Sequence, residues 1–456
     1  MQRLRFHLAL IAAKCSIILI KMLGRNASHN PGAIALKICP KFMELAPKAP
    51  KVICVTGTNG KTTVANLLTD ALVSDSKKVV SNRLGSNIVP GCTTNLINSL
   101  NIWGKCVVDA TVYEVDERAS RLILPYLKPD FLVVNNLFRD SLKRNGHPDY
   151  IFNILNTYCP DNTKLILNAD ELCSSQLKPN NDRVFFGIGK QETDLTKSIN
   201  LIADYSFCPE CGEVLDYDYL RYHHIGYAKC NKCGFHSHDA DYLATTIDRE
   251  NNTLTVMVNG EEQKYPLISD ITFNIYNELS VISTLLELGY SYEDAYKLVS
   301  QIKVPDSRFN QDEINGVPVI QVLSKGQNSV SSSRAFDYVS EEKGNKVVIL
   351  AMDDRHDRKK SVEYIGWIYD VDYEFFKRDS IKQIIAAGPR CYDHKVRLLL
   401  AGVDESIIHT CFEEVDSVEL INWEEIDSVY ILYDVYTYDL SCQIKEKVIK
   451  HLEGAK

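Results

Sequence analysis

The chain has 456 residues, which is enough for two to four domains. Its composition, 45% apolar and 24% charged, is typical of a globular protein, and its net charge of -9 argues against a nucleic-acid-binding protein. Fourteen cysteines, most of them scattered among apolar residues, favour buried thiols over a disulfide framework. We therefore expect a protein of a reducing compartment, the cytoplasm.

Residues 1–24 combine apolar runs with basic residues and predict an amphipathic helix. The runs Leu8–Ala13 and Ile17–Ile20 are separated by Lys14, so no uninterrupted stretch of about 20 apolar residues is present. Such a helix either packs on the protein or lies on the inner face of the membrane as a peripheral contact. The prolines of residues 25–50 indicate a connector, so residues 1–50 are expected to form an N-terminal helix and connector.

The next segment has the pattern of a nucleotide-binding loop. Val52–Val55 predicts a buried strand, Thr56–Thr63 contains two glycines, and a helical pattern follows. The backbone N–H groups, the helix N-terminus and a lysine together bind phosphates in such a loop, and Thr62 is placed to bind Mg²⁺. The predicted nucleotide-binding residues are Thr58, Asn59, Gly60, Lys61, Thr62 and Thr63. Val55 stands where a strict Walker A sequence has glycine, and the competing interpretation is a surface turn before a helix.

Strands predicted at 106–113, 131–135 and 164–167 alternate with helices, which indicates an α/β fold with a mostly parallel sheet. Glu114 closes the first of these strands, and carboxylates at the carboxyl end of a parallel strand point into the ligand crevice. Glu114 is therefore the first candidate for binding Mg²⁺, with Asp116 or Glu117 assisting. The alternative is a solvated acidic turn.

Residues 201–245 interrupt the alternation and predict a metal site. Two Cys-x-x-Cys pairs stand eighteen residues apart, a pattern that predicts a tetrahedral zinc site of four thiolates. The expected ligands are Cys208, Cys211, Cys230 and Cys233. Four thiolates leave no position open for water, so the expected role is structural. The nearby histidines, expected at the surface or behind the ligands, are His223, His224, His236 and His238.

The remaining segments complete the predicted organisation. Residues 246–265 resemble a hairpin with Asn259-Gly260 as its turn, and residues 270–303 are predicted to be helical. Asn274 and Asn277 there can hydrogen-bond an adenine edge. Strands predicted at 317–322, 346–351, 384–387 and 428–433 indicate a second, smaller α/β domain. The expected domains are a central ATP-binding domain at 51–305, with a zinc-ribbon insertion at 201–245, and a C-terminal domain at 306–456.

The order of these motifs resembles the Mur ligase family. Thr56–Thr63 has the Mur ligase form of the phosphate loop, which accounts for Val55, and Glu114, Asn168-Ala169-Asp170 and Asn274–Asn277 follow in that family's order. Arg308 stands where the family places an arginine after its central domain. The four-cysteine insertion and the later segments Trp367–Asp370 and Gly388–Asp393 resemble the MurT-type subunits of lipid II isoglutaminyl synthase.

The resemblance implies an ATP- and Mg²⁺-dependent enzyme that also holds Zn²⁺. Such subunits activate the α-carboxylate of D-glutamate in the lipid II stem peptide as an acyl phosphate, and ammonia then gives D-isoglutamine. A partner, a GatD-like class I glutaminase, supplies the ammonia, and the MurT-type subunit lends an aspartate to its Cys–His pair. Asp357 is the first candidate for that aspartate, and Asp353 is the alternative. Arg308 would bind the nucleotide.

The sequence departs from the family pattern at two places and leaves two alternatives. Ser141 follows Asp140 where other Mur ligases have a metal-binding histidine, and residues 353–358 lack the glycine usual before the Trp-Ile element. One alternative is a Mur-type ligase that joins an amino acid to a carboxylate. The other is a nucleotide-binding paralogue that has lost catalysis.

Overall fold

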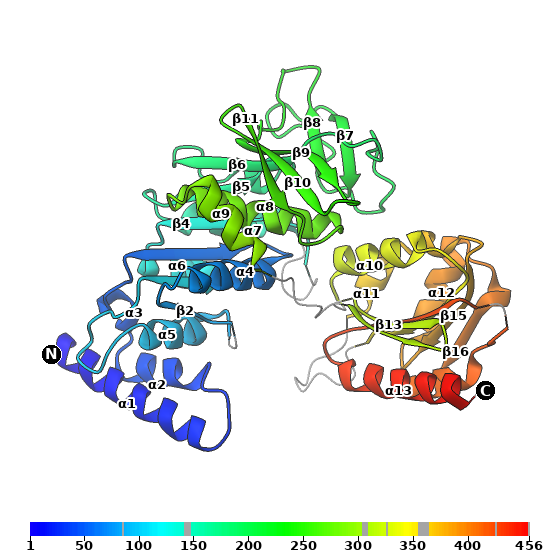
Figure 1. Ribbon diagram of the computed structural model, residues 1–456, viewed down its shortest axis with the longest axis horizontal. Helices are drawn as coiled ribbons and strands as arrows, with labels where there is room; N and C mark the ends of the chain where they lie inside the picture. The colour runs from blue at the N-terminus through cyan, green and yellow to red at the C-terminus, as the bar shows by residue number, and fades with distance from the viewer. Residues whose placement is uncertain are drawn as a thin grey trace. The chain divides into compact units, whose positions relative to one another are not determined.

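A computed structural model of the chain describes residues 1–83, 86–140, 147–302, 309–324, 327–353, 364–424 and 426–454 (Figure 1). The chain forms two compact units. The central unit comprises Met1–Phe138, Pro148–Ser198 and Asp204–Val304. The C-terminal unit comprises Arg139–His147, Ile199–Ala203 and Pro305–Lys456.

The central unit is built on a nine-stranded sheet of order β11-β10-β9-β6-β5-β4-β1-β3-β2. All its neighbouring strands from β2 to β9 run parallel, and β10 and β11 complete it as an antiparallel hairpin. Its strands are β1 (Lys51–Thr56), β2 (Val79–Ser81), β3 (Ala110–Glu114), β4 (Phe131–Val134), β5 (Lys164–Asn168), β6 (Arg183–Ile188), β9 (Tyr242–Asp248), β10 (Thr253–Val258) and β11 (Glu261–Pro266). This sheet confirms the predicted α/β class.

Helices of the central unit alternate with these strands and cover the sheet (Figure 1). They are α4 (Lys61–Ser74), α5 (Val89–Asn98), α6 (Ser120–Leu127), α7 (Pro148–Tyr158), α8 (Thr272–Glu287) and α9 (Tyr292–Ser300). Strands β1 and β4 lie in the middle of the sheet and are buried almost throughout, as expected of strands covered on both faces. The predicted hairpin turn is also present, since Asn259 and Gly260 both have positive φ, at 51° and 84°.

Three helices precede the sheet: α1 (Gln2–Met22), α2 (Asn30–Ile38) and α3 (Phe42–Leu45). Residues 25–50 therefore contain two short helices, whereas their prolines indicated a connector. Pro31 lies in the first turn of α2, where a missing N–H breaks no helical hydrogen bond. Gly32 lies against the carbonyl of Pro90 in α5, where a Cβ would collide. Within the described residues, no helix has the length and apolar content needed to cross a membrane.

The predicted insertion forms a small separate sheet, in which β7 (Asp216–Tyr222) pairs antiparallel with β8 (Ile225–Lys229). The loops beside these strands carry the four cysteines. From Asp204 on, the insertion belongs to the central unit, and it follows β6 in the chain.

The C-terminal unit contains a six-stranded sheet of order β12-β13-β17-β14-β15-β16, parallel except for β12. Its strands are β12 (Phe309–Ile314), β13 (Val317–Leu323), β14 (Lys346–Ala351), β15 (Ile381–Ala387), β16 (Ile408–Cys411) and β17 (Ser428–Tyr433). Its helices are α10 (Ser329–Glu341), α11 (Gly366–Tyr369), α12 (Cys391–Ala401) and α13 (Tyr438–Gly454). Alternate residues of β14 enter two hydrophobic clusters, one shared with α10 and α12 and the other with α13, so helices cover both faces.

Candidate nucleotide site and metal centre

The phosphate loop joins β1 to α4, and two glycines give it its shape. Gly57 has φ 122°, and a Cβ there would stand 2.9 Å from the carbonyl oxygen of Asn136. Gly60 has φ 88° at the start of α4, and a Cβ there would collide with the side chain of Asn277. Only glycine suits both positions. The loop is therefore a cradle of bare backbone, as phosphate binding requires.

The end of β4 holds this loop in place through side-chain and backbone hydrogen bonds. The N–H of Thr58 donates to the carbonyl oxygen of Asn136 and the N–H of Asn59 to its Oδ1, both at 2.9 Å. The N–H of Phe138 donates to Oγ1 of Thr58 at 2.9 Å. Asn136 therefore acts as a brace that holds the phosphate loop from the end of β4.

Asn277 lies behind the loop, against Gly60. Its Oδ1 accepts a hydrogen bond from Nδ2 of Asn135 at 2.7 Å, and its Nδ2 donates to Oδ1 of Asn274 at 3.3 Å. Nδ2 of Asn274 in turn donates to Oγ of Ser269 at 3.1 Å. Both Asn274 and Asn277 are buried, so in this structure they support the phosphate loop from the side of α8.

Lys61 begins α4, and its ammonium group lies over the loop. Its Nζ stands 2.8 Å from Oε1 of Glu117 and donates to the carbonyl oxygens of Gly57 and Thr58. Thr62 is exposed and Thr63 half-exposed beside it, in the first helical turn. Because that turn leaves backbone N–H groups without intrahelical acceptors, a cation and several donors meet at one point.

The three acidic residues at and just after the end of β3 have different surroundings. Oε1 of Glu114 accepts a hydrogen bond from Nδ2 of Asn87 at 3.1 Å, and its half-exposed side chain stands at the end of the strand next to β1. Asp116 is buried and caps the following turn, where its Oδ1 accepts the N–H groups of Arg118 and Ala119 at 3.1 Å. Glu117 is the partner of Lys61. The half-exposed carboxylate of Glu114 and the exposed hydroxyl of Thr62 offer oxygen atoms of the kind that Mg²⁺ accepts.

A buried ion-pair network links the cysteine-bearing insertion to the loop after β5 and to α8. Arg221 of β7 donates to Oδ2 of Asp170 at 3.0 Å and to the hydroxyl of Tyr276 at 2.7 Å. The hydroxyls of Tyr276 and Tyr219 both donate to Asp170, at 2.6 and 2.9 Å. Burial opposes the charge of Arg221, but Tyr276, Asp170 and Asp194 outweigh burial and raise its pKa. Sequence reasoning missed Arg221, since no local motif marks it.

A second contact of the insertion uses His224. Its Nε2 stands 2.9 Å from Oε1 of Glu171, and Oε2 of Glu171 accepts the N–H of Leu137 at 2.9 Å. His223 and His224 are both buried, and neither belongs to the cysteine cluster. The insertion is therefore fixed to the loops after β4 and β5, which border the phosphate loop.

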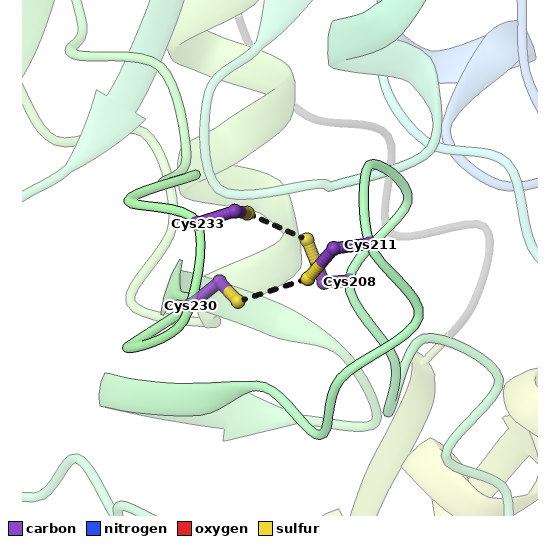
Figure 2. Close-up of side chains that lie close together, drawn as sticks. All are labelled: Cys208, Cys211, Cys230 and Cys233. Carbon is purple, nitrogen blue, oxygen red and sulfur yellow. Dashed lines mark hydrogen bonds between the residues drawn. The ribbon is translucent and has the colours of Figure 1, made fainter.

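The four predicted cysteines converge. Their sulfur atoms all lie within 4.8 Å of one another, with Sγ of Cys208 at 3.5 Å from that of Cys233 and Sγ of Cys211 at 3.6 Å from that of Cys230 (Figure 2). A tetrahedral zinc ion with Zn–S bonds of about 2.3 Å separates its sulfurs by similar distances. A disulfide would need about 2.05 Å. The donor set and its spacing fit Zn²⁺.

In the C-terminal unit, Asp353 follows β14 and is only 1% exposed. Its Oδ2 lies close to Gly388, where a Cβ would stand 2.5 Å from that oxygen and 3.1 Å from Oε1 of Glu414. Gly388 has φ 99°. Asp357, the other candidate aspartate, and Arg308, the candidate nucleotide-binding arginine, lie outside the described residues.

Comparisons with known proteins agree with this arrangement. A Mur ligase middle domain model matches residues 55–210, and a MurT ligase C-terminal model matches residues 326–438. The chain is 29% identical to the lipid II isoglutaminyl synthase subunit MurT of Staphylococcus aureus over 405 residues, covering 88% of each chain. It is 25% identical to that of Streptococcus pneumoniae over 451 residues, covering 97% of each.

A solved structure shares the fold at low sequence identity. The pseudomurein peptide ligase type C of Methanothermus fervidus superposes with a TM-score of 0.68 at 18% identity, over 90% of this chain and 81% of that one. The similarity extends through both units of the chain. This structural similarity shows the fold. The MurT ligase C-terminal model is the match that points to MurT-type proteins within the Mur ligases.

Proposed function

The chain is a MurT-type member of the Mur ligase family, and from this membership we propose that it is the ATP-dependent synthetase subunit of a glutamine-dependent amidotransferase. Its reaction is the amidation of the α-carboxylate of D-glutamate in the stem peptide of lipid II to D-isoglutamine. It works in the cytoplasm, at the inner face of the membrane where a lipid-linked substrate is found. The enzyme is a carbon–nitrogen ligase.

One observation carries the proposal: a Mur ligase middle domain and a MurT ligase C-terminal domain occur in the same chain. The middle domain alone would suit any ligase of the family. The C-terminal match favours the amidotransferase over a ligase that joins an amino acid to a carboxylate.

The nucleotide site supports the first step, in which the carboxylate becomes an acyl phosphate. Phosphoryl transfer needs positioning and charge neutralisation more than a protein nucleophile. Lys61 and the first turn of α4 would hold the phosphates of ATP, and Glu114 and Thr62 would hold Mg²⁺, which supplies positive charge for the transferring phosphoryl group. Asn135 and Asn136 keep the loop in its shape. Arg308 would add a further cation.

The four cysteines would hold Zn²⁺ as a structural ion. They stand in loops whose sheet is fixed to Asp170 and Glu171, so the ion would stabilise the insertion that contacts the nucleotide side of the sheet. No step of the reaction needs it.

The second step needs ammonia, which we assign to a partner subunit, a GatD-like class I glutaminase. An aspartate of the C-terminal unit would orient the histidine of the partner's Cys–His pair, the usual role of the third member of a nucleophilic triad. Asp353 is almost fully buried in this chain, so we favour Asp357, with Asp353 as the alternative.

The test is reconstitution with the glutaminase. The purified pair is given lipid II, ATP, Mg²⁺ and glutamine, and the amidated product is measured by mass spectrometry. We expect amidation with glutamine or ammonia, and none with Lys61→Ala. If a free amino acid supported the reaction and ammonia did not, the chain would be an amino-acid ligase. ATP binding with no turnover under any of these conditions would identify a paralogue without catalysis.

A further inference from the structure

Helix α1 has two apolar faces, and only one is used inside the protein. Phe6, Ala9, Leu10 and Ala13 are buried, and the ring of Phe6 stacks on that of Phe42 at 4.9 Å between centroids. This face packs on α2, α3 and α5. The other face carries a second set of apolar residues, and these are exposed.

That second set forms a continuous stripe. Its members are Leu4, Leu8, Ile11, Cys15, Ile18 and Met22. They recur at alternating intervals of four and three residues, which places them along one side of a helix. All six are exposed, and the five other than Cys15 are each at least 53% exposed. A stripe of this length on a protein surface marks an interaction site.

The charge beside the stripe is of one sign. Residues 1–29, which hold α1 and the chain just after it, contain the five basic residues Arg3, Arg5, Lys14, Lys21 and Arg25 and no Asp or Glu. The whole chain has a net charge of -9, so the acidic excess lies elsewhere. Arg3, Lys14 and Lys21 are separated by eleven and seven residues, which places them along one edge of the stripe. Arg5 stands on the other edge.

We propose that this face of α1 docks on a membrane surface rich in anionic lipid. The apolar stripe would enter the boundary between headgroups and acyl chains, and the basic edges would contact the phosphates. The helix lies flat, because its other face is buried in the protein. A second copy of the chain would bring an equally basic face, and the like charges would oppose pairing. The docking surface follows from α1 alone and does not depend on the proposed activity.

Vesicle sedimentation of the full chain with its partner subunit tests the proposal. The vesicles are phosphatidylglycerol with phosphatidylcholine, or phosphatidylcholine alone. We expect binding to the anionic vesicles, and a loss of at least about tenfold in the triple variant Leu8→Ser, Ile11→Ser, Ile18→Ser. The variant Arg3→Gln, Lys14→Gln, Lys21→Gln should also lose at least about tenfold, and salt should weaken binding of the native chain.

The matched control is Leu400→Ser, which removes an equally exposed leucine from helix α12 of the C-terminal unit. It should bind vesicles as the native chain does, and all variants should keep their ATP affinity and melting temperature. The proposal fails if the native chain ignores anionic vesicles or if the triple variant binds them unchanged. Self-association through α1 is the competing outcome. It would be shown by light scattering if the native chain formed a complex with itself, bound no vesicles, and lost that complex in the triple variant. Vesicle binding without amidation in the reconstituted assay would reject only the proposed function.

Discussion

The two units carry parallel sheets of similar build, and the carboxylates near the ends of their strands either pair with a cation or cap a turn, as Asp116 does in the central unit. In the central unit, Glu117 pairs with Lys61 at 2.8 Å and Asp170 with Arg221 at 3.0 Å. In the C-terminal unit, Asp434 after β17 accepts the backbone N–H groups of Tyr436 and Thr437, at 2.6 and 3.1 Å.

The difference teaches that a carboxylate at a strand end does not by itself indicate a ligand site. Where it pairs with a cation beside a glycine loop, it belongs to a prearranged charged site. Where it accepts backbone N–H groups, it shapes a turn. We expect the central unit to bind ATP and activate the substrate carboxylate with its own residues. We expect the C-terminal unit to contribute through the proposed glutaminase subunit.

The largest expected effect separates the two units by function. Glu114→Gln should lower ATP-dependent amidation by roughly 100- to 1,000-fold with either ammonia or glutamine, because metal charge stabilisation is worth several kcal/mol.

Asp357→Asn should abolish the glutamine-dependent reaction and keep the ammonia-dependent one. The exposed Asp379→Asn is the control in the same unit and should change neither rate. Equal loss with both nitrogen sources in Asp357→Asn would contradict this division, and Asp353→Asn would then be tested in the same way.

The next effect compares two arginines. Arg221→Ala should lower the free energy of unfolding of the central unit by about 3 to 5 kcal/mol, because it leaves the buried Asp170 without its cation. Arg378→Ala removes an exposed ion pair with Glu341 in the C-terminal unit and should cost less than about 1 kcal/mol. Chemical denaturation followed by fluorescence measures both. Equal losses of unfolding free energy in the two variants would show that burial does not make the Arg221 ion pair contribute more to stability than the exposed Arg378 pair.

The same two regions show what the sequence could predict. The strand–loop–helix arrangement around residues 56–63, the position of Glu114 at a strand end and the convergence of the four cysteines were predictable, because strand, turn, helix and metal-ligand spacing are local patterns. The brace by Asn136 and the network around Arg221 were not, since they join residues 77 and 51 positions apart in the chain. Helix α2 was missed because a proline in a first helical turn looks the same in sequence as a proline in a connector, and α3 was missed because it spans only four residues.

A smaller, pH-dependent effect tests the burial of α8 behind the phosphate loop. Burial raises the pKa of Glu278 from 4.5 to about 8. Between these values the folded protein holds a proton that the unfolded chain releases, so stability falls as pH rises. From pH 6 to 8 this group should remove roughly 2 to 3 kcal/mol, and Glu278→Gln should abolish that loss. Replacement of the exposed Glu293 in α9, Glu293→Gln, should leave the dependence of the unfolding free energy on pH unchanged. An unchanged slope in Glu278→Gln would mean that another group causes it.

The smallest effect concerns the carboxyl edge of the C-terminal sheet, and it compares two glycines with similar backbones. Gly388 has φ 99° and Gly402 has φ 82°, so alanine is strained at both and should cost about 1 kcal/mol at either from the backbone alone. At Gly388 the new Cβ would also stand 2.5 Å from Oδ2 of the buried Asp353, whereas at Gly402 its nearest neighbour is the flexible end of Lys377 at 3.5 Å. Gly388→Ala should therefore lower the free energy of unfolding by about 1 to 2 kcal/mol more than Gly402→Ala. Because Asp353 must move to make room, glutamine-dependent amidation should fall in Gly388→Ala if Asp353 is the aspartate that serves the partner, and stay unchanged if Asp357 serves instead.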